Sequence, residues 1–454
     1  MVMKIVILGG VAAGAKVAAK SRRLLPEAKI CLYTDDTHIS YSSCGLPYYI
    51  QGNFEDYRTL LVRSPEEFEA QGVEVFLRHK AIKLLPDSQQ VLILNLDNNR
   101  SHLVDYDKLV IATGARPTIP DIKDVNLKNV FTLRKIEDGI AIRQCALKSK
   151  HATIIGSGFI GLELLESFVE LGLKVTLIEF ANHIAPMFDV DMSEVIEDQL
   201  SSINNGRFNI LTSEYATEFL SSEKGEVIGV KTGTGKEFST DMVVICTGVR
   251  PNVEFAQDAG VALGETGAIR VNKHMHTNLP HIYACGDCAE KTSLITGKKI
   301  WIPLGSTANK EGRIAAINLS GGDADFEGIL GSAVVRCMAL TMSMTGLTEK
   351  RAEQLGFDPV SASVTKYDKV GYMPDVNNIT LKLIADKRTG LLLGGQAIGA
   401  GDADKRINTL TTALLGKLTV YEFTRNDITY APPFSPTIDP LINAAQILYK
   451  KLEQ

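Results

Sequence analysis

The segment Lys4-Ile5-Val6-Ile7-Leu8-Gly9-Gly10-Val11-Ala12-Ala13-Gly14 decides the fold, because a related segment returns later in the chain. Its counterpart is Ala152-Thr153-Ile154-Ile155-Gly156-Ser157-Gly158-Phe159-Ile160-Gly161. Each copy is a short apolar run followed by a glycine turn, which is typical of a buried strand that leads into a helix. Such a turn brings backbone N–H groups and a helix N-terminus against a pyrophosphate. The sequence therefore predicts two dinucleotide-binding units.

A second pair of segments closes the two predicted units. Leu109-Val110-Ile111-Ala112-Thr113-Gly114 returns as Val243-Val244-Ile245-Cys246-Thr247-Gly248, again an apolar strand followed by a glycine turn. The region from about 330 to 454 carries no glycine fingerprint and mixes strand-like runs (361–367, 379–384) with helical runs (404–415, 440–452). We therefore expect an α/β protein with two Rossmann-like dinucleotide-binding domains and a C-terminal α+β domain.

Composition excludes several classes of function. A formal net charge of −5 over 454 residues gives no basis for nucleic-acid binding. No apolar run reaches the roughly 18 residues of a membrane span, and the first residues form a strand rather than a secretory signal. Seven scattered cysteines suit a reducing compartment, so we expect a cytoplasmic protein. One Cys-x-x-Cys pair, Cys285 and Cys288, is weak evidence for a metal, and no metal site is expected.

The two glycine turns differ in detail. The later turn has all three glycines, and Glu179 ends the next strand, where a carboxylate can bind ribose hydroxyls. No arginine for a 2′-phosphate follows it, so NADH is favoured and NADPH remains possible. The earlier turn has Val11 at the middle glycine position, and Thr34 stands where a carboxylate is expected, with Asp35 just after it.

Together with the strand ending in Gly286-Asp287, these elements resemble the pyridine nucleotide–disulfide oxidoreductase superfamily over essentially the whole chain. The resemblance implies that the first unit binds FAD, the second binds NADH and the C-terminal domain forms a homodimer. The implied domains are an FAD domain in two parts (1–115 and 251–328), an NADH domain (116–250) and a dimerisation domain (329–454).

The resemblance also implies the residues of each cofactor site. Those expected to bind FAD are Gly9, Gly10, Ala13, Gly14, Thr34, Asp35, Ser43, Ala81, Ala112, Thr113, Gly114, Arg134, Asp287, Leu304, Ser306 and Phe434. Those expected to bind NADH are Gly156, Gly158, Phe159, Ile160, Gly161, Glu163, Glu179, Phe180 and Gly248. Phe159 is expected to gate the flavin.

Cys44 distinguishes the branches of this superfamily. It lies in Ser40-Tyr41-Ser42-Ser43-Cys44-Gly45-Leu46-Pro47-Tyr48-Tyr49, and the position of the second cysteine in the Cys-x4-Cys enzymes is Tyr49. A single sulfur is oxidised either to a mixed disulfide with a small thiol or to a sulfenic acid. Gly45-Leu46-Pro47 predicts a helix start, whose dipole favours the Cys44 thiolate.

Three features favour the mixed disulfide. The superfamily's NADH oxidases and peroxidases typically have a histidine in the first glycine turn, where this chain has Ala12. Tyr430, in Tyr-Ala-Pro-Pro, and Tyr372 match the two tyrosines of coenzyme A disulfide reductase, which act on the partner subunit's cysteine. By the same resemblance, coenzyme A phosphates and thiol are expected to bind a set of basic and hydroxyl residues, namely Lys16, Lys20, Arg23, Ser40 and Ser43.

The predicted activity is FAD-dependent NAD(P)H reduction of coenzyme A disulfide, or of a coenzyme A persulfide or polysulfide. The catalytic residues are Cys44, Tyr430 and Tyr372, with both tyrosines contributed across the homodimer interface. An NADH oxidase or peroxidase that cycles a cysteine sulfenic acid is the main alternative. A flavin-bound redox sensor is a second alternative, which the cofactor fingerprints and Cys44 disfavour.

Overall fold

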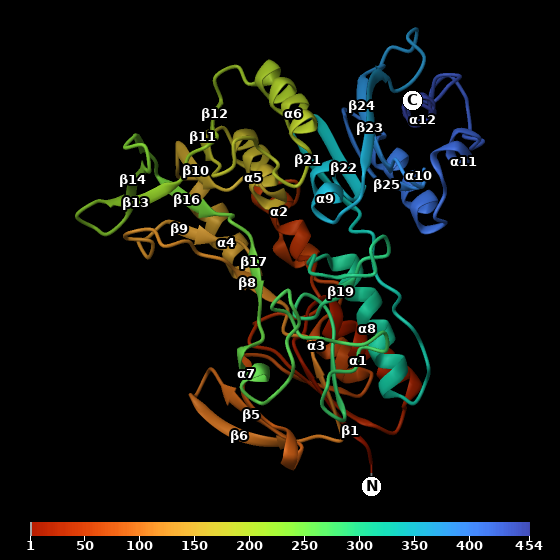
Figure 1. The fold of residues 1–454 in the computed structure, drawn as a ribbon. Coiled ribbons are helices and arrows are strands. Elements are labelled where there is room, and N and C mark those ends of the chain that lie inside the picture. Colours follow the sequence, from red (N-terminus) through yellow and green to blue (C-terminus); the bar gives the residue numbers. More distant parts are fainter. Residues whose placement is uncertain (1) are drawn as a thin grey trace. The chain divides into compact units, whose positions relative to one another are not determined.

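The computed structural model describes residues 2–454 as two compact units (Figure 1). Unit 1 contains the chain up to Thr118, Leu133–Ala141 and Gly248–Ile329. Unit 2 contains Ile119–Thr132, Ile142–Thr247 and Leu330–Gln454. Helix α4 (Ile136–Ala146) begins in unit 1 and ends in unit 2.

Unit 1 is built on a five-stranded parallel sheet with β1 (Lys4–Leu8) at its centre. The strands lie in the order β18 (Ile282–Ala284), β7 (Lys108–Ile111), β1, β2 (Lys29–Tyr33) and β3 (Val73–Phe76). Helices α1 (Ala12–Leu24) and α8 (Gly305–Leu319) lie side by side (Figure 1). A Cβ at Gly312 would lie 2.6 Å from the carbonyl oxygen of Ala13, so this packing requires glycine.

Unit 1 also contains smaller sheets and several short helices. An antiparallel sheet is formed by β4 (His79–Leu85), β5 (Gln90–Asn95) and β6 (Arg100–Asp105). The strands β8 (Ala115–Pro117) and β17 (Val249–Pro251) form an antiparallel pair, as do β19 (Lys291–Thr292) and β20 (Lys299–Ile300). The short helices are η1 (Ser43–Gly45), α2 (Leu46–Gln51), η2 (Tyr57–Leu60), α3 (Pro65–Ala70), η3 (Pro86–Ser88) and α7 (Glu254–Gln257).

The first half of unit 2 repeats the parallel sheet of unit 1. Its strands lie in the order β12 (Phe208–Leu211), β11 (Lys174–Ile178), β10 (His151–Ile155), β16 (Met242–Ile245) and β9 (Val130–Thr132). Helices α5 (Phe159–Glu170) and α6 (Val190–Ile203) follow β10 and β11. A small antiparallel sheet contains β13 (Ala216–Ser221), β14 (Val227–Thr232) and β15 (Glu237–Ser239).

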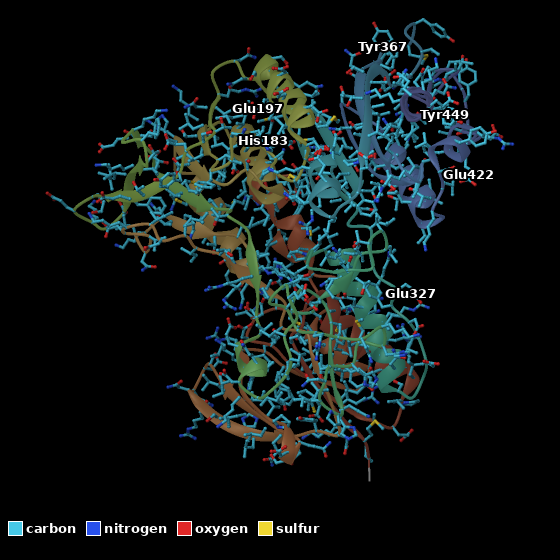
Figure 2. All side chains as sticks on the ribbon, in the orientation of Figure 1. His183, Glu197, Glu327, Tyr367, Glu422 and Tyr449 are labelled. Carbon is cyan, nitrogen blue, oxygen red and sulfur yellow. The ribbon has the colours of Figure 1, made fainter. Side chains whose placement is uncertain are left out.

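The second half of unit 2 is an antiparallel sheet with helices packed on it. The strands lie in the order β21 (Ala333–Cys337), β22 (Leu340–Gly346), β25 (Leu392–Gly399), β24 (Asn378–Asp386) and β23 (Pro359–Tyr367). The helices are α9 (Glu349–Gln354), α10 (Ala403–Leu415), α11 (Val420–Thr424) and α12 (Pro440–Leu452). Glu422 caps α11, and Tyr449 of α12 packs against Tyr421, with ring centroids 5.5 Å apart (Figure 2).

The predicted fold class is confirmed by these sheets. The strand predicted at 4–8 and the helix predicted at 440–452 have the expected bounds, and the other predicted elements differ by a few residues at most. No helix within residues 2–454 is long and apolar enough to cross a membrane.

Candidate active site

The two glycine turns have the same construction. Gly9 and Gly156 adopt φ values of +107° and +102°, which side chains rarely tolerate. A Cβ at Gly14 would lie 1.8 Å from the carbonyl oxygen of Gly9, and one at Gly161 would lie 2.0 Å from that of Gly156. The first turn of each helix therefore packs so closely against the preceding glycine turn that only glycine fits at positions 14 and 161.

Helices α1 and α5 begin directly at these two turns. No side chain of the described chain caps either helix, and neither has an acidic residue in its first turn. The first N–H groups of a helix lack intrahelical partners, and the helix dipole attracts anions to them. A Cβ at Gly158 would enter open space, so a ligand can approach the backbone there. Both turns can thus hold a pyrophosphate.

The Gly286-Asp287 turn lies in unit 1 and fits a hydroxyl-rich ligand. One carboxylate oxygen of Asp287 accepts a bond from the Arg134 guanidinium at 3.0 Å. The other, Oδ1, is buried without a hydrogen-bond partner among residues 2–454. A buried acceptor without a donor is costly, so a ligand hydroxyl bound there would satisfy it. The ribityl chain of FAD supplies such hydroxyls, and the residues present fit this cofactor.

Two buried charged residues, Lys291 and Glu311, stabilise the Gly286-Asp287 turn. The sequence alone did not identify them. Lys291 Nζ donates to the carbonyl oxygens of Gly286 (2.7 Å) and Ala289 (2.8 Å), and the Glu311 carboxylate accepts from Gly286 N at 2.7 Å. Both charged side chains are fully buried. Burial raises the pKa of the Glu311 carboxyl to about 7, against the opposing effect of Lys291. Nothing in the local sequence distinguishes these residues from surface charges.

At the end of β2 the structure separates the roles of Thr34 and Asp35. The Thr34 hydroxyl is buried and accepts a bond from Asp36 N at 3.3 Å. Asp35 is exposed, and its carboxylate accepts a bond from Lys135 at 3.2 Å. The carboxylate that a ligand can reach at this edge therefore belongs to Asp35.

The other predicted FAD residues lie in unit 1, except one. Ala112, Thr113 and Gly114 follow β7, Ala81 lies in β4, Ser43 begins η1, and Leu304 and Ser306 lie at the start of α8. Phe434 lies in unit 2. Their assignment to FAD stays a prediction.

Glu179 follows β11 and is fixed against the glycine turn of unit 2. Its carboxylate accepts bonds from Ser157 N (2.8 Å), Ser157 Oγ (2.6 Å) and Ala181 N (2.8 Å). Glu197 of α6 binds the backbone of the following segment at Ile184 N, near His183 (Figure 2). The Glu179 carboxylate is therefore held beside the glycine turn by these three hydrogen bonds, in a position that suits a ribose.

Glu163 and Cys246 lie close to the same turn. Burial, reinforced by the nearby Glu166, raises the pKa of Glu163 to about 7. Burial also raises the pKa of Cys246 to about 12, with Glu163 adding to the effect. Phe159 and Ile160 form the first turn of α5. Gly248, the last predicted NADH residue, lies in unit 1 at φ +95°.

Cys44 is the one exposed cysteine of residues 2–454. It lies in η1, immediately before α2, which begins at Leu46 with Pro47 in its first turn, so the predicted helix start is confirmed. Burial raises the pKa of other thiols, to about 11 at Cys31, for example, and Cys285 and Cys288 are fully buried with raised pKa values. Cys44 is therefore the thiol that a solvent-borne disulfide can reach.

The basic residues predicted to bind coenzyme A lie on α1. Lys16, Lys20 and Arg23 are spaced by four and three residues and share one face of this helix. The neighbouring Arg22 has a different role, because it donates to the carbonyl oxygens of Pro26, Ala28 and Gly72. Ser40, at φ +50°, lies in the same unit.

The two predicted catalytic tyrosines lie in unit 2, on exposed loops. Tyr372 is 74% exposed in the loop between β23 and β24, and Tyr430 is 49% exposed in the loop between α11 and α12. Buried Arg406 joins the bases of both loops. It donates to the carbonyl oxygen of Asp368 at 2.8 Å and to the carboxylate of Asp439.

Comparison with known proteins agrees with this construction. The family model for pyridine nucleotide-disulphide oxidoreductases matches residues 3–312, and the model for their dimerisation domain matches residues 332–441. The chain is 35% identical over 452 residues to the NAD(P)H coenzyme A polysulfide/persulfide reductase of Pyrococcus horikoshii, covering 99% of each chain. It is 33% identical over 454 residues to an NADH oxidase of Methanocaldococcus jannaschii, again covering 99% of each.

A solved structure shows the same fold. The NAD-dependent persulfide reductase from A. fulgidus superposes with a TM-score of 0.95 at 36% identity, covering 99% of this chain and 84% of that one. Membership of the matched family implies FAD and NAD(P)H as cofactors, which fits the two glycine turns and the Asp287 acceptor. The chain therefore belongs to the pyridine nucleotide-disulphide oxidoreductase family, as an NAD(P)H-dependent flavoprotein oxidoreductase with a dimerisation domain.

Proposed function

We propose that this protein uses NADH to reduce coenzyme A disulfide, or a coenzyme A persulfide or polysulfide, through Cys44. The observation that carries the proposal is a single exposed cysteine in η1, just before α2, with Tyr49 where a dithiol enzyme needs a second cysteine. The P. horikoshii polysulfide/persulfide reductase and the A. fulgidus persulfide reductase, which resemble this chain, support a sulfur-bound substrate.

Residues of this chain carry out the reduction of the disulfide substrate. The Cys44 thiolate attacks one sulfur of R–S–S–R, forms a mixed disulfide and releases the first RS⁻. Tyr430 of a second subunit protonates that leaving group, and Tyr372 assists at the same place. Two electrons then cleave the mixed disulfide, which releases the second RS⁻ and restores the thiolate. Bound FAD would transfer those electrons from NADH, so the balance is NADH + H⁺ + RSSR → NAD⁺ + 2 RSH.

The remaining site residues bind and orient the reactants. Lys16, Lys20 and Arg23 on α1 bind the phosphates of the coenzyme A moiety, while Ser40 and Ser43 position its thiol end. The α5 turn binds the NADH pyrophosphate, and the fixed Glu179 carboxylate accepts the ribose hydroxyls and repels a 2′-phosphate. NADH is thereby preferred to NADPH.

NADH oxidase activity is the second candidate, and the M. jannaschii relative supports it. That chemistry would cycle Cys44 through a sulfenic acid with oxygen or peroxide as acceptor. A base near the sulfur would assist it, but the segment from Gly9 to Gly14 contains no ionisable side chain.

The test is anaerobic NADH oxidation with coenzyme A disulfide or coenzyme A persulfide, compared with oxygen or peroxide as acceptor. We expect rapid turnover with a sulfur acceptor and its loss in Cys44→Ser. The matched control is Cys145→Ser, since Cys145 is half-buried in α4 and should be dispensable. Rapid oxygen consumption without disulfide turnover would favour the oxidase, and full disulfide reduction by Cys44→Ser would overturn the role of this sulfur.

A further inference from the structure

The backbone of the Gly286-Asp287 turn is held by charged side chains on both sides of Gly286. The Gly286 N–H, which belongs to the preceding peptide, donates to the Glu311 carboxylate at 2.7 Å. The Gly286 carbonyl oxygen, which belongs to the following peptide, accepts a bond from Lys291 Nζ at 2.7 Å. Gly286 has a φ of +81°, and a Cβ there would lie 2.9 Å from that of Ala13 in α1. Both peptide planes that determine where Asp287 points are therefore fixed.

A third donor holds the other side of Asp287. Trp301 Nε1 donates to the carbonyl oxygen of Asp287 at 2.8 Å. Lys291 begins β19 and Trp301 directly follows β20, and these two strands pair with each other. One hairpin therefore supplies a donor to the backbone before the Asp287 side chain and another donor to the backbone after it.

The turn is surrounded by two carboxylates and two cations. Arg134 lies 3.0 Å from one oxygen of Asp287, and Lys291 lies 3.8 Å from Glu311. The side chains of Lys291 and Glu311 are fully buried, which is costly for charged groups unless they are paired and hydrogen-bonded. Apolar side chains of similar volume often stabilise a core as well as a buried ion pair does. The pair is therefore better explained by what it holds, which is the turn that carries Asp287.

The Asp287 side chain presents one acceptor that no part of the described chain uses. Its Oδ1 atom is buried and has no hydrogen-bond partner among residues 2–454, and it is the atom that suits a hydroxyl of FAD. A hydrogen bond weakens steeply when its length or angle leaves a narrow range, so the acceptor must be held in one orientation. We propose that Lys291, Glu311 and Trp301 are positioning residues that orient Asp287 toward FAD and thereby slow the release of this cofactor.

The proposal rests on the FAD site at Asp287 and is independent of the proposed disulfide reduction. It assigns a role in cofactor retention to three residues that lie outside both glycine turns. These residues act on FAD through Asp287, so their effect on FAD release should vanish once the Asp287 side chain is absent. A residue that only stabilised the fold would have the same effect with or without that side chain.

The test is a double-mutant cycle on the release of FAD from the holoenzyme. The protein is diluted without NADH or a sulfur acceptor, and the rise of flavin fluorescence gives the release rate. Lys291→Met should release FAD roughly tenfold faster than the unmodified protein. In the Asp287→Ala background the same substitution should change the rate by less than about twofold. Lys298→Met, at an exposed lysine between β19 and β20, is the matched control and should have no effect.

Variants at the other two positions separate the hydrogen bond from the bulk of the side chain. Glu311→Gln keeps an acceptor for the Gly286 N–H and should retain FAD almost as well as the unmodified protein. Glu311→Leu removes that acceptor and should release FAD roughly tenfold faster. Trp301→Phe removes the N–H and keeps an aromatic ring, and release should be about fivefold faster.

Three results would overturn the proposal. The first is an equal effect of Lys291→Met with and without the Asp287 side chain. The second is equal FAD release from Glu311→Gln and Glu311→Leu, and the third is undiminished retention of FAD in Asp287→Ala. If Lys291→Met does not fold, the two Glu311 variants in both backgrounds decide the question. Failure of the proposed disulfide reduction would leave these results unaffected, because no sulfur substrate is present.

Discussion

Arg406 and Asp439 form a buried ion pair, in which the guanidinium Nε contacts both carboxylate oxygens at 3.2 Å. The same guanidinium donates to the carbonyl oxygen of Asp368 at 2.8 Å, and Asp439 also accepts a bond from Ser435 at 3.0 Å. Asp368 is at the base of the Tyr372 loop, and Asp439 ends the Tyr430 loop. One side chain thus connects the two loops that carry the proposed catalytic tyrosines.

Replacement of Arg406 should disturb both loops at once. In Arg406→Met, Asp439 stays buried without its cation, which typically costs about 3–5 kcal/mol of unfolding free energy. We expect a lower melting temperature, together with slower reduction of the disulfide and unchanged flavin reduction by NADH. Calorimetry and stopped-flow absorbance measure these quantities. The exposed Arg351 provides a control, and an Arg406→Met protein with unaltered disulfide turnover would contradict a link to the tyrosines.

Lys382 makes a comparable connection between the two halves of unit 2. Its ammonium lies 2.8 Å from both Asp191 and Glu349 and 3.4 Å from the buried Asp189. Asp189 directly precedes α6 and Asp191 lies in the first turn of that helix, whereas Lys382 lies in β24. These contacts therefore join the nucleotide-binding half to the antiparallel sheet.

Lys382→Met should therefore leave three carboxylates close together around an apolar side chain. Because one of them is buried, we expect a loss of about 3 kcal/mol in unfolding free energy, measured by urea denaturation. Lys350→Met removes an exposed lysine of α9 and should change little. Equal midpoints for the two variants would show that the Lys382 contacts contribute no net stability.

Asp287 should control retention of FAD. Asp287→Ala removes the buried acceptor oxygen and the partner of Arg134 together. A hydrogen bond to a charged group contributes about 1.5–3 kcal/mol, so the FAD dissociation constant should rise by roughly 10- to 100-fold. The ratio of flavin to protein absorbance after dialysis, and fluorescence titration of the apoprotein, measure this change. The exposed Asp258 is a suitable control, and full retention of FAD would remove Asp287 from the site.

The fold was more predictable from the sequence than the site. Gly9 and Gly156 are dictated locally, because a positive φ and a close backbone approach leave no alternative residue. The strands that precede these glycines are short apolar runs, a pattern that few other secondary structures fit. The partners of Lys291, Arg406 and Lys382 are distant in sequence or unremarkable in composition, so only the folded chain reveals them. The pairing of Phe180 with Tyr215 likewise depends on the neighbouring order of β11 and β12.

Glu163 should make stability depend on pH. Its pKa is raised from 4.5 to about 7 in the folded protein, mainly because burial disfavours the ionised carboxylate. Between these two values the folded state binds more protons than the unfolded state, so the free energy of unfolding falls as pH rises through this window. Below about pH 4.5 both states are protonated, and above about pH 7 both are ionised, so this contribution becomes constant.

Glu163→Gln, which cannot ionise, should remove part of this decline. The variant should gain stability relative to the unmodified protein as pH rises from 4.5 to 7, and the difference should level off above that range. Chemical denaturation at several pH values measures it, with the exposed Glu327 as the control position. The buried Glu311 carboxyl, whose pKa is also raised to about 7, should retain its own share of the pH dependence in the variant. A difference between variant and unmodified protein that stays flat across this range would show that Glu163 titrates normally in the folded chain.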